Sequence, residues 1–532
     1  MRHRTKIFWL IIIFIASLRF VFFLLDDESI SDLCFKRDIS GIGTIVDEPV
    51  SKDSGQALVV GVEQLIVAPD SDVNQIRDLD IDSHIIKNQG VDEGASEYSS
   101  TELSLTCTKE HQIIKMKTAL YPKYSFGDSI YFSGRLSAPY NFRSEDGRTF
   151  NYRGFLAKDG IYSEIRSAKV ELIKEMNFAN TVNYEPLDSG IDKDPHTNIN
   201  SEIDRSSFDD FQRDMRKSIA DEATEYLTSV LFKVKRGFVN NLNRVLGEPH
   251  SALAAGLVVG EKAALGKDLL DDFRRVGLIH IIVLSGFNIT IVADALRRIL
   301  SILPRKWAII IGGIGMVLFC IMVGGGATVI RSCMMGSLAL FADLSRRDYN
   351  VLRALSFAGL LMVIQNPSIV IFDPSFQLSF LATLGLILLA SPIEKILPFI
   401  TDKFGIRGIV SATLSTQIFV APFILHMTGD LSIVGILVNI LVLPLIPLTM
   451  LFVFLAGFLG FIFTPISQIF AWVAHFLLSY ELFIVEHSAT LPLASIHIGA
   501  FPFYYVVIFY LLFTAIMLGT IYFRRRTNLH LP

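Results

Sequence analysis

Hydrophobic residues dominate the chain after Ser251, where long apolar segments alternate with short polar gaps. About 20 apolar residues are enough for a helix to cross a bilayer. The pattern predicts membrane spans near 277–296, 307–324, 327–343, 352–370, 376–392, 409–427, 431–463, 467–487 and 503–523. Another apolar run follows the basic residues Arg2, Arg4 and Lys6, and we interpret residues 1–25 as a retained membrane anchor rather than a cleaved signal peptide.

The segment 431–463 is too long for one simple crossing and contains Pro444 and Pro447, which predicts a discontinuous or re-entrant element. Counted as one net crossing, it gives about ten crossings with the anchor included. The basic residues of the gaps then lie on the same side as the N-terminus, which the positive-inside rule assigns to the cytoplasm. We therefore expect both termini in the cytoplasm, with a basic tail at 524–532, and the region after the anchor exported.

Between the anchor and the spans, residues 26–182 carry short runs of alternating apolar and polar residues, which predict a small antiparallel barrel or sandwich. An insertion at 69–99 holds eight acidic residues against two basic ones, which is typical of a disordered or mobile segment. The polar stretch 183–207 is interpreted as a linker. Residues 208–250 fit an amphipathic helix at the membrane surface, or a solvated helix packed on the β domain.

Composition agrees with a polytopic α-helical membrane protein, because 51% of the residues are hydrophobic and the mean hydropathy is +0.47. The net charge of −4 excludes a general attraction to nucleic acid, so an anionic partner must be handled by local positive groups. Cys34 and Cys107 form either a disulfide or two free, buried thiols. The sequence contains no CxxC motif, no His/Cys cluster and no Walker-type loop, so we expect no metal, no cofactor and an external energy source.

The segment 276–294 is long enough to cross a membrane but contains histidine, serine, asparagine and aspartate. Intramembrane ionisable groups usually face a bundle interior or an aqueous cavity, which makes this segment a candidate conduction or substrate path. The alternative is that its polar side chains hydrogen-bond neighbouring helices together, and the sequence favours neither interpretation. On a continuous helix with about 100° per residue, one third of the circumference would hold Gly277, His280, Leu284, Asn288 and Asp294.

Three segments stand out, namely ALAAGLVVGEKAALGKDLLDDFRRVGLIHIIVLSGFNIT from Ala252, GGGATVIRSCMMG from Gly324 and NPSIVIFDPSFQLSFLATLG from Asn366. Together they resemble the membrane domain of the ComEC-type competence proteins, with weaker matches at STQIFVAPF from Ser415 and VNILVLPLIPL from Val438. NYRGFLAKDGIYSEI from Asn151 resembles the end of the OB-like exported domain that precedes that membrane domain. The resemblance implies an OB-like domain within 26–182 and a helical channel domain at 251–523, in a bacterial cytoplasmic membrane. The implied function is transport of single-stranded DNA during natural transformation.

Many members of this family continue into a metallo-β-lactamase-like domain, proposed to degrade the strand that is not imported. This chain stops at Pro532, and none of its eleven histidines forms an HxHxDH cluster. We therefore expect that it is not an enzyme and that a separate nuclease acts on the other strand. Besides single-stranded DNA and membrane lipids, the expected partners are a DNA-receptor protein, a cytoplasmic helicase or ATPase and, as a further option, a second copy of the chain.

A passage for DNA needs groups that replace phosphate hydration without holding the strand too tightly. As a hypothesis, His280, Ser285, Gly286 and Asn288 line or gate the path. An arginine at the bilayer centre costs about 2.5–3.5 kcal/mol on insertion scales. Arg331 therefore favours an anion site, with Gly324–Gly326 offering unwound backbone amides, or else snorkels to the outer interface.

Polar residues of the later spans have two interpretations each. Asp373 and Pro374 predict the N-cap and the first position of a helix. Gln377, Gln417 and Asn439 need partners in an apolar helix, so they either line the path or join helices.

In the β domain, Tyr131, Arg135 and Arg153 are candidate contacts for single-stranded DNA, because such barrels bind strands through aromatics and basic grooves. The acidic insertion favours the alternative of a scaffold that holds the exported face of the channel or docks a DNA-delivery protein. For the whole chain, one alternative is a transporter of another anionic polymer or of a lipid-linked solute. The other is a membrane-embedded enzyme that uses His280, Ser285 and Asp294, although no catalytic residue is assigned.

Overall fold

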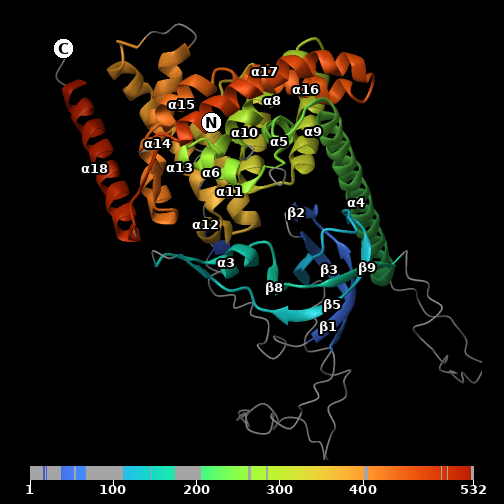
Figure 1. Ribbon diagram of the computed structural model, residues 1–532. Coiled ribbons are helices and arrows are strands. Elements are labelled where there is room, and N and C mark those ends of the chain that lie inside the picture. Colours follow the sequence, from blue (N-terminus) through green and yellow to red (C-terminus); the bar gives the residue numbers. More distant parts are fainter. Residues whose placement is uncertain are drawn as a thin grey trace, which may run out of the picture. The chain divides into compact units, whose positions relative to one another are not determined.

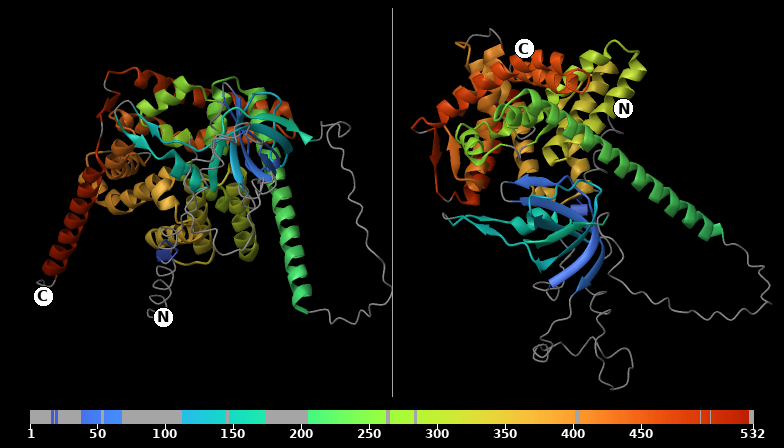
Figure 2. Two further views of the ribbon diagram at one scale, coloured as in Figure 1. Left: turned by 90° about the horizontal axis from the view of Figure 1, so that it is seen from below. Right: turned by 45° about the vertical axis from the view of Figure 1, so that its right-hand side comes forward.

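The computed structural model describes most of the chain and divides it into two compact units (Figures 1 and 2). The described residues are 16–17, 19–20, 38–52, 55–67, 112–144, 147–173, 205–261, 265–282, 285–400, 405–492, 494–499 and 501–528. One unit, the β unit, comprises 29–138 and 160–232, and the other, the helical unit, comprises 1–28, 139–159 and 233–532. The acidic insertion, most of the linker and most of the anchor lie outside the described residues.

The β unit is built on a closed ring of strands. Its strands are β1 (Asp38–Ile45), β2 (Val50–Lys52), β3 (Gly55–Val67), β4 (Ile113–Thr118), β5 (Ser129–Ser137), β8 (Ile161–Ile165) and β9 (Lys169–Leu172). Pairing runs β1-β3-β4-β8-β5 and returns from β5 to β1, with β2 on β3 and β9 on β5. All pairings are antiparallel except β4 with β8. This barrel-like sheet is the architecture that the alternating pattern predicts.

The barrel closes because alternate side chains of each strand point inward. In β1, every second residue is buried, which places Ile39 and Ile45 in the core. Phe132 of β5 is also fully buried, so it is part of the core and is unavailable to a ligand. Its neighbour Tyr131 lies on the other face of the strand and is partly exposed.

The helical unit contains nearly all of the apolar segments. Its elements before the first long apolar helix are β6 (Phe142–Arg143), β7 (Thr149–Phe150), α3 (Tyr152–Ala157), the end of α4 (Arg205–Val245), α5 (His250–Val259), α6 (Lys267–Arg275), α7 (Ile279–Ile282) and α8 (Gly286–Leu300). The later helices are α9 (Arg305–Val323), α10 (Ala327–Leu344), α11 (Val351–Gln365), α12 (Ile369–Phe372), α13 (Pro374–Ile396), α14 (Ile406–Met427), α15 (Gly435–Val442), α16 (Ile446–Leu459), α17 (Thr464–Ala489) and α18 (Phe503–Asn528). The short strands β10 (Asp430–Ser432) and β11 (Ser495–His497) pair with each other.

Five helices of the described chain are long and apolar enough to cross a membrane, namely α9, α10, α13, α14 and α17. The pair α15 and α16, bent by 52°, makes a sixth if it counts as one span. The bend lies at Pro444, within the segment predicted to be discontinuous, because proline disrupts the helix that precedes it. The segments α8, α11 and the apolar part of α18 are shorter, so the structure supports a smaller number of spans than the pattern predicts.

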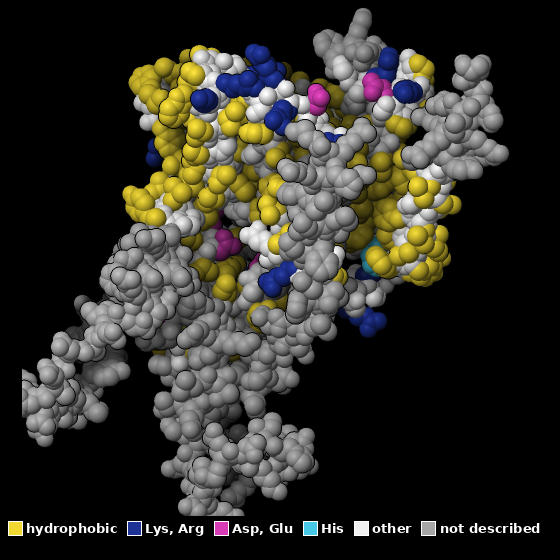
Figure 3. Space-filling view, turned by 180° about the vertical axis from the view of Figure 1, so that it is seen from behind, with side chains coloured by type: hydrophobic (Ala, Val, Ile, Leu, Met, Phe, Trp, Pro, Cys, Tyr) yellow, Lys and Arg dark blue, Asp and Glu magenta, His cyan; other side chains and the backbone are white. Residues whose placement is uncertain are grey.

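Exposed side chains on these helices are largely apolar, as the space-filling view shows for one face of the molecule (Figure 3). On α9, Trp307, Ile310, Ile314 and Val317 are between 51% and 60% exposed. Their spacing places them along one side of the helix. Water would penalise such a stripe, whereas lipid accommodates it, so these side chains face the bilayer.

The largest apolar core joins the end of α4 and α5–α7 to α15, α16 and α17. The α16–α17 pair lies across the end of the helical unit that is remote from α12 (Figure 1). Asn241 Nδ2 of α4 donates to the Gly457 carbonyl of α16 at 3.2 Å. Lys235 of α4 is buried and pairs with Glu261 at 3.4 Å.

The segment 139–159 comes from the sequence between β5 and β8 but packs with the helical unit. Its Lys158 Nζ lies 3.6 Å from Asp373, and Asn366 Nδ2 donates to the Lys158 carbonyl at 2.6 Å. A side chain at Gly154 would overlap the Phe372 ring, so glycine permits this close approach. The segment is therefore fastened to residues 366–373, which connect α11 to α13.

Candidate functional site

The predicted path segment is broken at its polar centre. α7 ends at Ile282 and α8 begins at Gly286, with Ser285 between them as the N-cap of α8. The Ser285 hydroxyl accepts a hydrogen bond from the backbone N–H of Asn288 at 3.3 Å, which is the usual way a serine caps the start of a helix. The prediction of one polar face assumed a continuous helix and is wrong, because the break changes the direction of every side chain after it. His280 and Asp294 are exposed, whereas Asn288 is fully buried.

Arg331 is buried in α10 without a compensating carboxylate among the described residues. Its Nε donates to Ser379 Oγ at 2.7 Å and its Nη2 to Ser332 Oγ at 3.1 Å. Its Nη1 lies 3.3 Å from the Met335 sulfur, a weak acceptor, and the group faces the Phe380 ring at 6.0 Å. All of these partners are neutral, so the positive charge of the guanidinium remains uncompensated.

Tyr349, between α10 and α11, interacts electrostatically with Arg331 but does not supply the missing negative charge. Burial raises the pKa of the Tyr349 phenol, and Arg331 opposes that rise only in part. The phenol is consequently neutral at pH 7, and its hydroxyl donates to the Met335 carbonyl at 3.2 Å.

The start of α8 lies beside this arginine. A methyl group added to Gly286 would be 2.8 Å from Arg331 Nη2 and 3.0 Å from Ser332 Oγ. The first amides of a helix carry a partial positive charge, and here they adjoin a full one. We call Ser285, Gly286, Arg331, Ser332 and Ser379 the arginine site. At this site Arg331 lies beside the predicted path residues at the start of α8, and the chemistry favours an anionic group.

Asn288 joins helices rather than lining a passage. Its Nδ2 donates to the Leu257 carbonyl of α5 at 3.1 Å and to the Ile281 carbonyl of α7 at 3.0 Å. Both amide hydrogens are therefore used within the protein. The interhelical alternative left open by the sequence is the one that the structure favours for this residue.

His280 is exposed on α7, and its Nδ1 contacts the Gly277 carbonyl at 3.0 Å. No hydrogen bond in the described residues connects it to Ser285 or to Arg331. The Asp294 carboxylate lies 3.5 Å from Arg297, a residue of its own helix. His280, Ser285 and Asp294 thus do not form the hydrogen-bonded arrangement that an enzyme using them would need.

The other predicted path residues bond locally. Gln377 Nε2 donates to the carbonyls of Val370 and Ile371 at 2.7 and 3.0 Å, which fastens α12 to α13. Gln417 Nε2 donates to the Ser432 carbonyl at 3.0 Å, while its buried Oε1 has no partner in the described part of the chain. Asn439 is buried, and its Oδ1 also has no partner among the described atoms.

The three glycines before α10 form a tight turn. Gly324 and Gly325 adopt positive φ angles of 95° and 59°, and their amides donate to the Ile321 and Cys320 carbonyls at the end of α9. These two amides are therefore used to close a helix and are not available to a phosphate. Asp373, by contrast, is the N-cap of α13 and Pro374 its first residue, as predicted.

Sequence reasoning missed Ser332, Ser379 and Phe380, which surround Arg331. Ser332 could have been found from its position next to Arg331. Ser379 and Phe380 come from α13, and no local signal in the sequence pairs them with α10.

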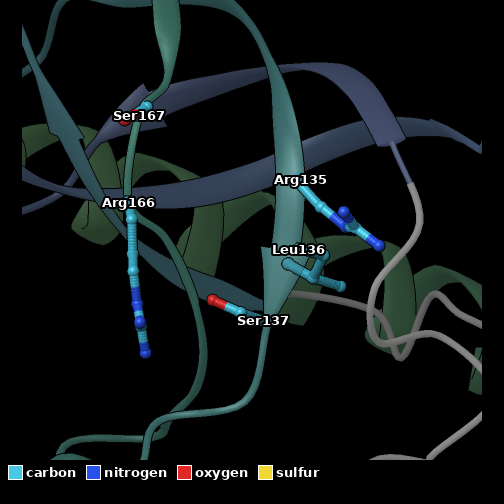
Figure 4. A pocket seen from close by; sticks show the side chains of 5 residues that line it. All are labelled: Arg135, Leu136, Ser137, Arg166 and Ser167. Carbon is cyan, nitrogen blue, oxygen red and sulfur yellow. The ribbon is translucent and has the colours of Figure 1, made fainter.

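The candidate DNA contacts of the β domain fall in different places. Arg135 lines a shallow pocket of about 290 Å³ with Leu136, Ser137, Arg166 and Ser167. The guanidinium groups of Arg135 and Arg166 point in different directions, so they do not converge on one ligand (Figure 4). Arg153 belongs to α3 of the helical unit. Cys34 and Cys107 lie outside the described residues, and the described part of the chain contains no cluster suited to a metal ion.

Comparison with known proteins adds a family. A model described as Competence protein matches residues 257–522, which is half of the chain. ComE operon protein 3 of Bacillus subtilis (strain 168) is 22% identical over 216 residues, covering 40% of this chain and 27% of that protein. Competence protein ComA of Neisseria gonorrhoeae is 26% identical over 263 residues, covering 46% of this chain and 35% of that protein.

An uncharacterized protein of Aquifex aeolicus (strain VF5) is 32% identical over 153 residues, covering 28% of this chain and 36% of that protein. The chain thus spans roughly a quarter to a third of the length of these relatives. No solved structure matches the chain.

Proposed function

The chain belongs to the competence protein family, and from that premise we propose that it conducts single-stranded DNA across the cytoplasmic membrane during natural transformation. The relatives named for competence support the biological context. The apolar helices support a location in the membrane. The single observation that carries a role in transport is the arginine site.

The arginine site suits a phosphate that passes and leaves. Arg331 is 7% exposed, and three of its five N–H groups have neutral acceptors. A structural arginine in lipid would normally be paired with an acid, because burying an uncompensated charge is costly. The adjoining N-terminus of α8 adds partial positive charge, as in transporters whose broken helices face an anionic substrate. One such site gives attraction without the tight hold of a basic tunnel.

The proposed arrangement in the membrane has about ten crossings, both termini in the cytoplasm and the β unit exported. Two contacts support it. Lys158 and Asp373 pair directly, and both lie in regions that the positive-inside rule assigns to the exported side. β10 and β11 also pair, and both lie in loops assigned to that side.

The test compares Arg331→Met with Arg331→Lys in a transformable strain that depends on this chain. Hydrogen bonds to charged groups contribute about 1.5–3 kcal/mol, so we expect Arg331→Met to reduce passage by roughly tenfold or more. Arg331→Lys should retain part of the activity. The measurement is labelled DNA in a nuclease-protected cytoplasmic pool, together with DNA bound at the cell surface, which should not change.

Arg353→Met is the matched control, because Arg353 is an exposed arginine on α11. It should import DNA like the wild type at equal protein level. Normal import by Arg331→Met would contradict the proposed role of the arginine site. If deletion of the whole chain leaves the protected pool intact, the chain transports another anionic polymer or a lipid-linked solute, or it is an enzyme.

A further inference from the structure

Residues 139–144 and 147–159 carry a contiguous group of aromatic rings that the proposed passage does not use, and we call these residues the aromatic hairpin. β6 and β7 pair through Phe142 with Phe150 and Arg143 with Thr149. Asn151 then caps α3 by accepting from the Gly154 amide at 2.9 Å. These local bonds fix the positions of the rings on both elements.

Five rings contact one another in sequence across the hairpin. The centroids of Tyr140 and Phe142 are 5.5 Å apart, and those of Phe142 and Tyr152 are 4.9 Å apart. Phe155 lies 6.5 Å from Tyr152 and 5.8 Å from Phe150. Tyr140, Phe142 and Phe150 are 53%, 49% and 38% exposed. Isolated exposed rings are ordinary, but a contiguous group marks an interaction surface.

Two arginines lie among these rings. Arg143 of β6 and Arg153 of α3 are exposed, and no carboxylate of the described residues pairs with either. Lys158 differs from them, because it pairs with Asp159 and Asp373. The surface thus combines exposed rings with two arginines that no carboxylate of the described chain neutralises.

The hairpin is held in place rather than free. The Lys158–Asp373 pair, the Asn366 bond to the Lys158 carbonyl and the close fit of Phe372 at Gly154 fasten it to residues 366–373. A surface fixed in this way loses little conformational freedom when it binds a ligand.

We propose that the aromatic hairpin binds single-stranded DNA by stacking bases on its rings, with Arg143 and Arg153 contacting phosphates. This inference rests on the proposed function and names the surface that receives the strand. Aromatic faces together with basic groups are the common means of binding single strands without sequence preference. The hairpin also belongs to the connection between two neighbouring strands of the barrel ring, β5 and β8, and OB-like barrels bind oligonucleotides through such a connection.

The first test measures binding of a fluorescent oligothymidine to the full chain in lipid nanodiscs by anisotropy. Base stacking contributes about 1–3 kcal/mol per base, so Phe142→Ala should weaken binding about fivefold or more. Tyr140→Ala with Phe142→Ala should weaken it further, and Arg143→Gln should reduce its dependence on salt. Tyr121→Ala is the matched control, since Tyr121 of the β unit is 70% exposed and contacts no other ring of the described residues.

Unchanged affinity in the double variant, with an unchanged unfolding temperature, overturns the inference. So does an absence of oligothymidine binding by the wild type. The Arg331→Met experiment distinguishes this failure from failure of the proposed function, because that variant should lose passage while it still binds the oligonucleotide at the hairpin.

A second test separates DNA from the bilayer, since aromatic rings with arginines also anchor proteins at membrane interfaces. Phe142→Trp, in a background whose three native tryptophans are replaced by phenylalanine, places a fluorophore in the surface. Oligothymidine should quench its fluorescence, and brominated lipid should not. Quenching by brominated lipid with no response to oligothymidine would make the hairpin a membrane anchor and would overturn the inference.

Discussion

Asn288 offers the most direct test of how the broken helix is held. Asn288→Ala removes the donors to the Leu257 and Ile281 carbonyls, at 3.1 and 3.0 Å, from a position with no exposed surface. A buried acceptor left without a partner costs about 1–3 kcal/mol. Side-chain hydrogen bonds measured inside membrane proteins average only about 0.6 kcal/mol. Asn288→Ala also removes Oδ1, which accepts from the Ser285 hydroxyl at 3.2 Å, so three side-chain hydrogen bonds are lost. The membrane average gives about 2 kcal/mol for three bonds, and two buried carbonyls left without a donor cost about 2–6 kcal/mol. We therefore expect the free energy of unfolding to decrease by about 2–6 kcal/mol.

The assay is denaturant or thermal unfolding of the purified chain in detergent. Thr290→Ala is the control on the same helix, because the Thr290 hydroxyl is exposed and bonds only to the Gly286 carbonyl, at 2.7 Å. It should change the free energy by less than about 0.5 kcal/mol. Since both amide hydrogens of Asn288 are bonded within the protein, DNA passage per folded molecule should stay near the wild-type value in Asn288→Ala.

Two results would refute this reasoning. If Asn288→Ala unfolds at the same denaturant concentration as Thr290→Ala, the two bonds do not hold α5, α7 and α8 together. If it is stable but passes no DNA, Asn288 acts on the strand, and its bonds to the carbonyls must open during passage.

Three further predictions concern the helices around the site. Asp373→Ala removes the N-cap of α13 and the ion pair with Lys158, and it should lower the free energy of unfolding by about 1–2 kcal/mol. Asp373→Asn should lie between Asp373→Ala and the wild type. Equal unfolding midpoints for the two variants would show that the ion pair does not contribute to stability. Gly385→Ala places a methyl group 2.8 Å from the Ser415 carbonyl oxygen and should lower the free energy of unfolding by about 1–3 kcal/mol. In the control Gly313→Ala, the added methyl group meets nothing within 4 Å, so this variant should be neutral or stabilising. A neutral Gly385→Ala would show that α13 and α14 are packed less closely. Ile314→Lys puts a charge on the apolar stripe of α9 at a side chain that is 55% exposed, and it should reduce the amount of protein in the membrane fraction. A normal amount would contradict a lipid-facing stripe.

Features set by neighbouring residues in the sequence could be predicted. The Asp373–Pro374 pair identifies a helix start because capping involves only the first turn. The alternating residues of β1 predict a buried face because side chains alternate along any strand. The bend between α15 and α16 follows from proline, whose effect is also local.

Features set by distant residues could not be predicted. Ser379 reaches Arg331 from a helix 48 residues away along the chain, and Asn288 bonds to Leu257, 31 residues away. The prediction that His280 and Asn288 share one face of a continuous helix failed for a related reason. Ser285 can cap a helix as well as lie inside one, and only packing against α5 and α10 decides between these states.

The hydrogen bond from Asn241 to the Gly457 carbonyl fixes the position of the end of α4 within the helical unit. Bonded groups share one depth, and the α16–α17 pair lies at the end of the helical unit remote from α12. If the loop that holds α12 is exported, as proposed, Asn241 sits toward the inner leaflet. The end of α4 from Lys233 belongs to the helical unit, where it packs in the largest apolar core with α5, α16 and α17. Lys235 is buried in this part of α4, and Glu261 lies 3.4 Å from its Nζ and offsets its charge. Because hydropathy averages over the whole of α4, its many charged residues hide this apolar end, although Phe238 and Leu242 belong to the core.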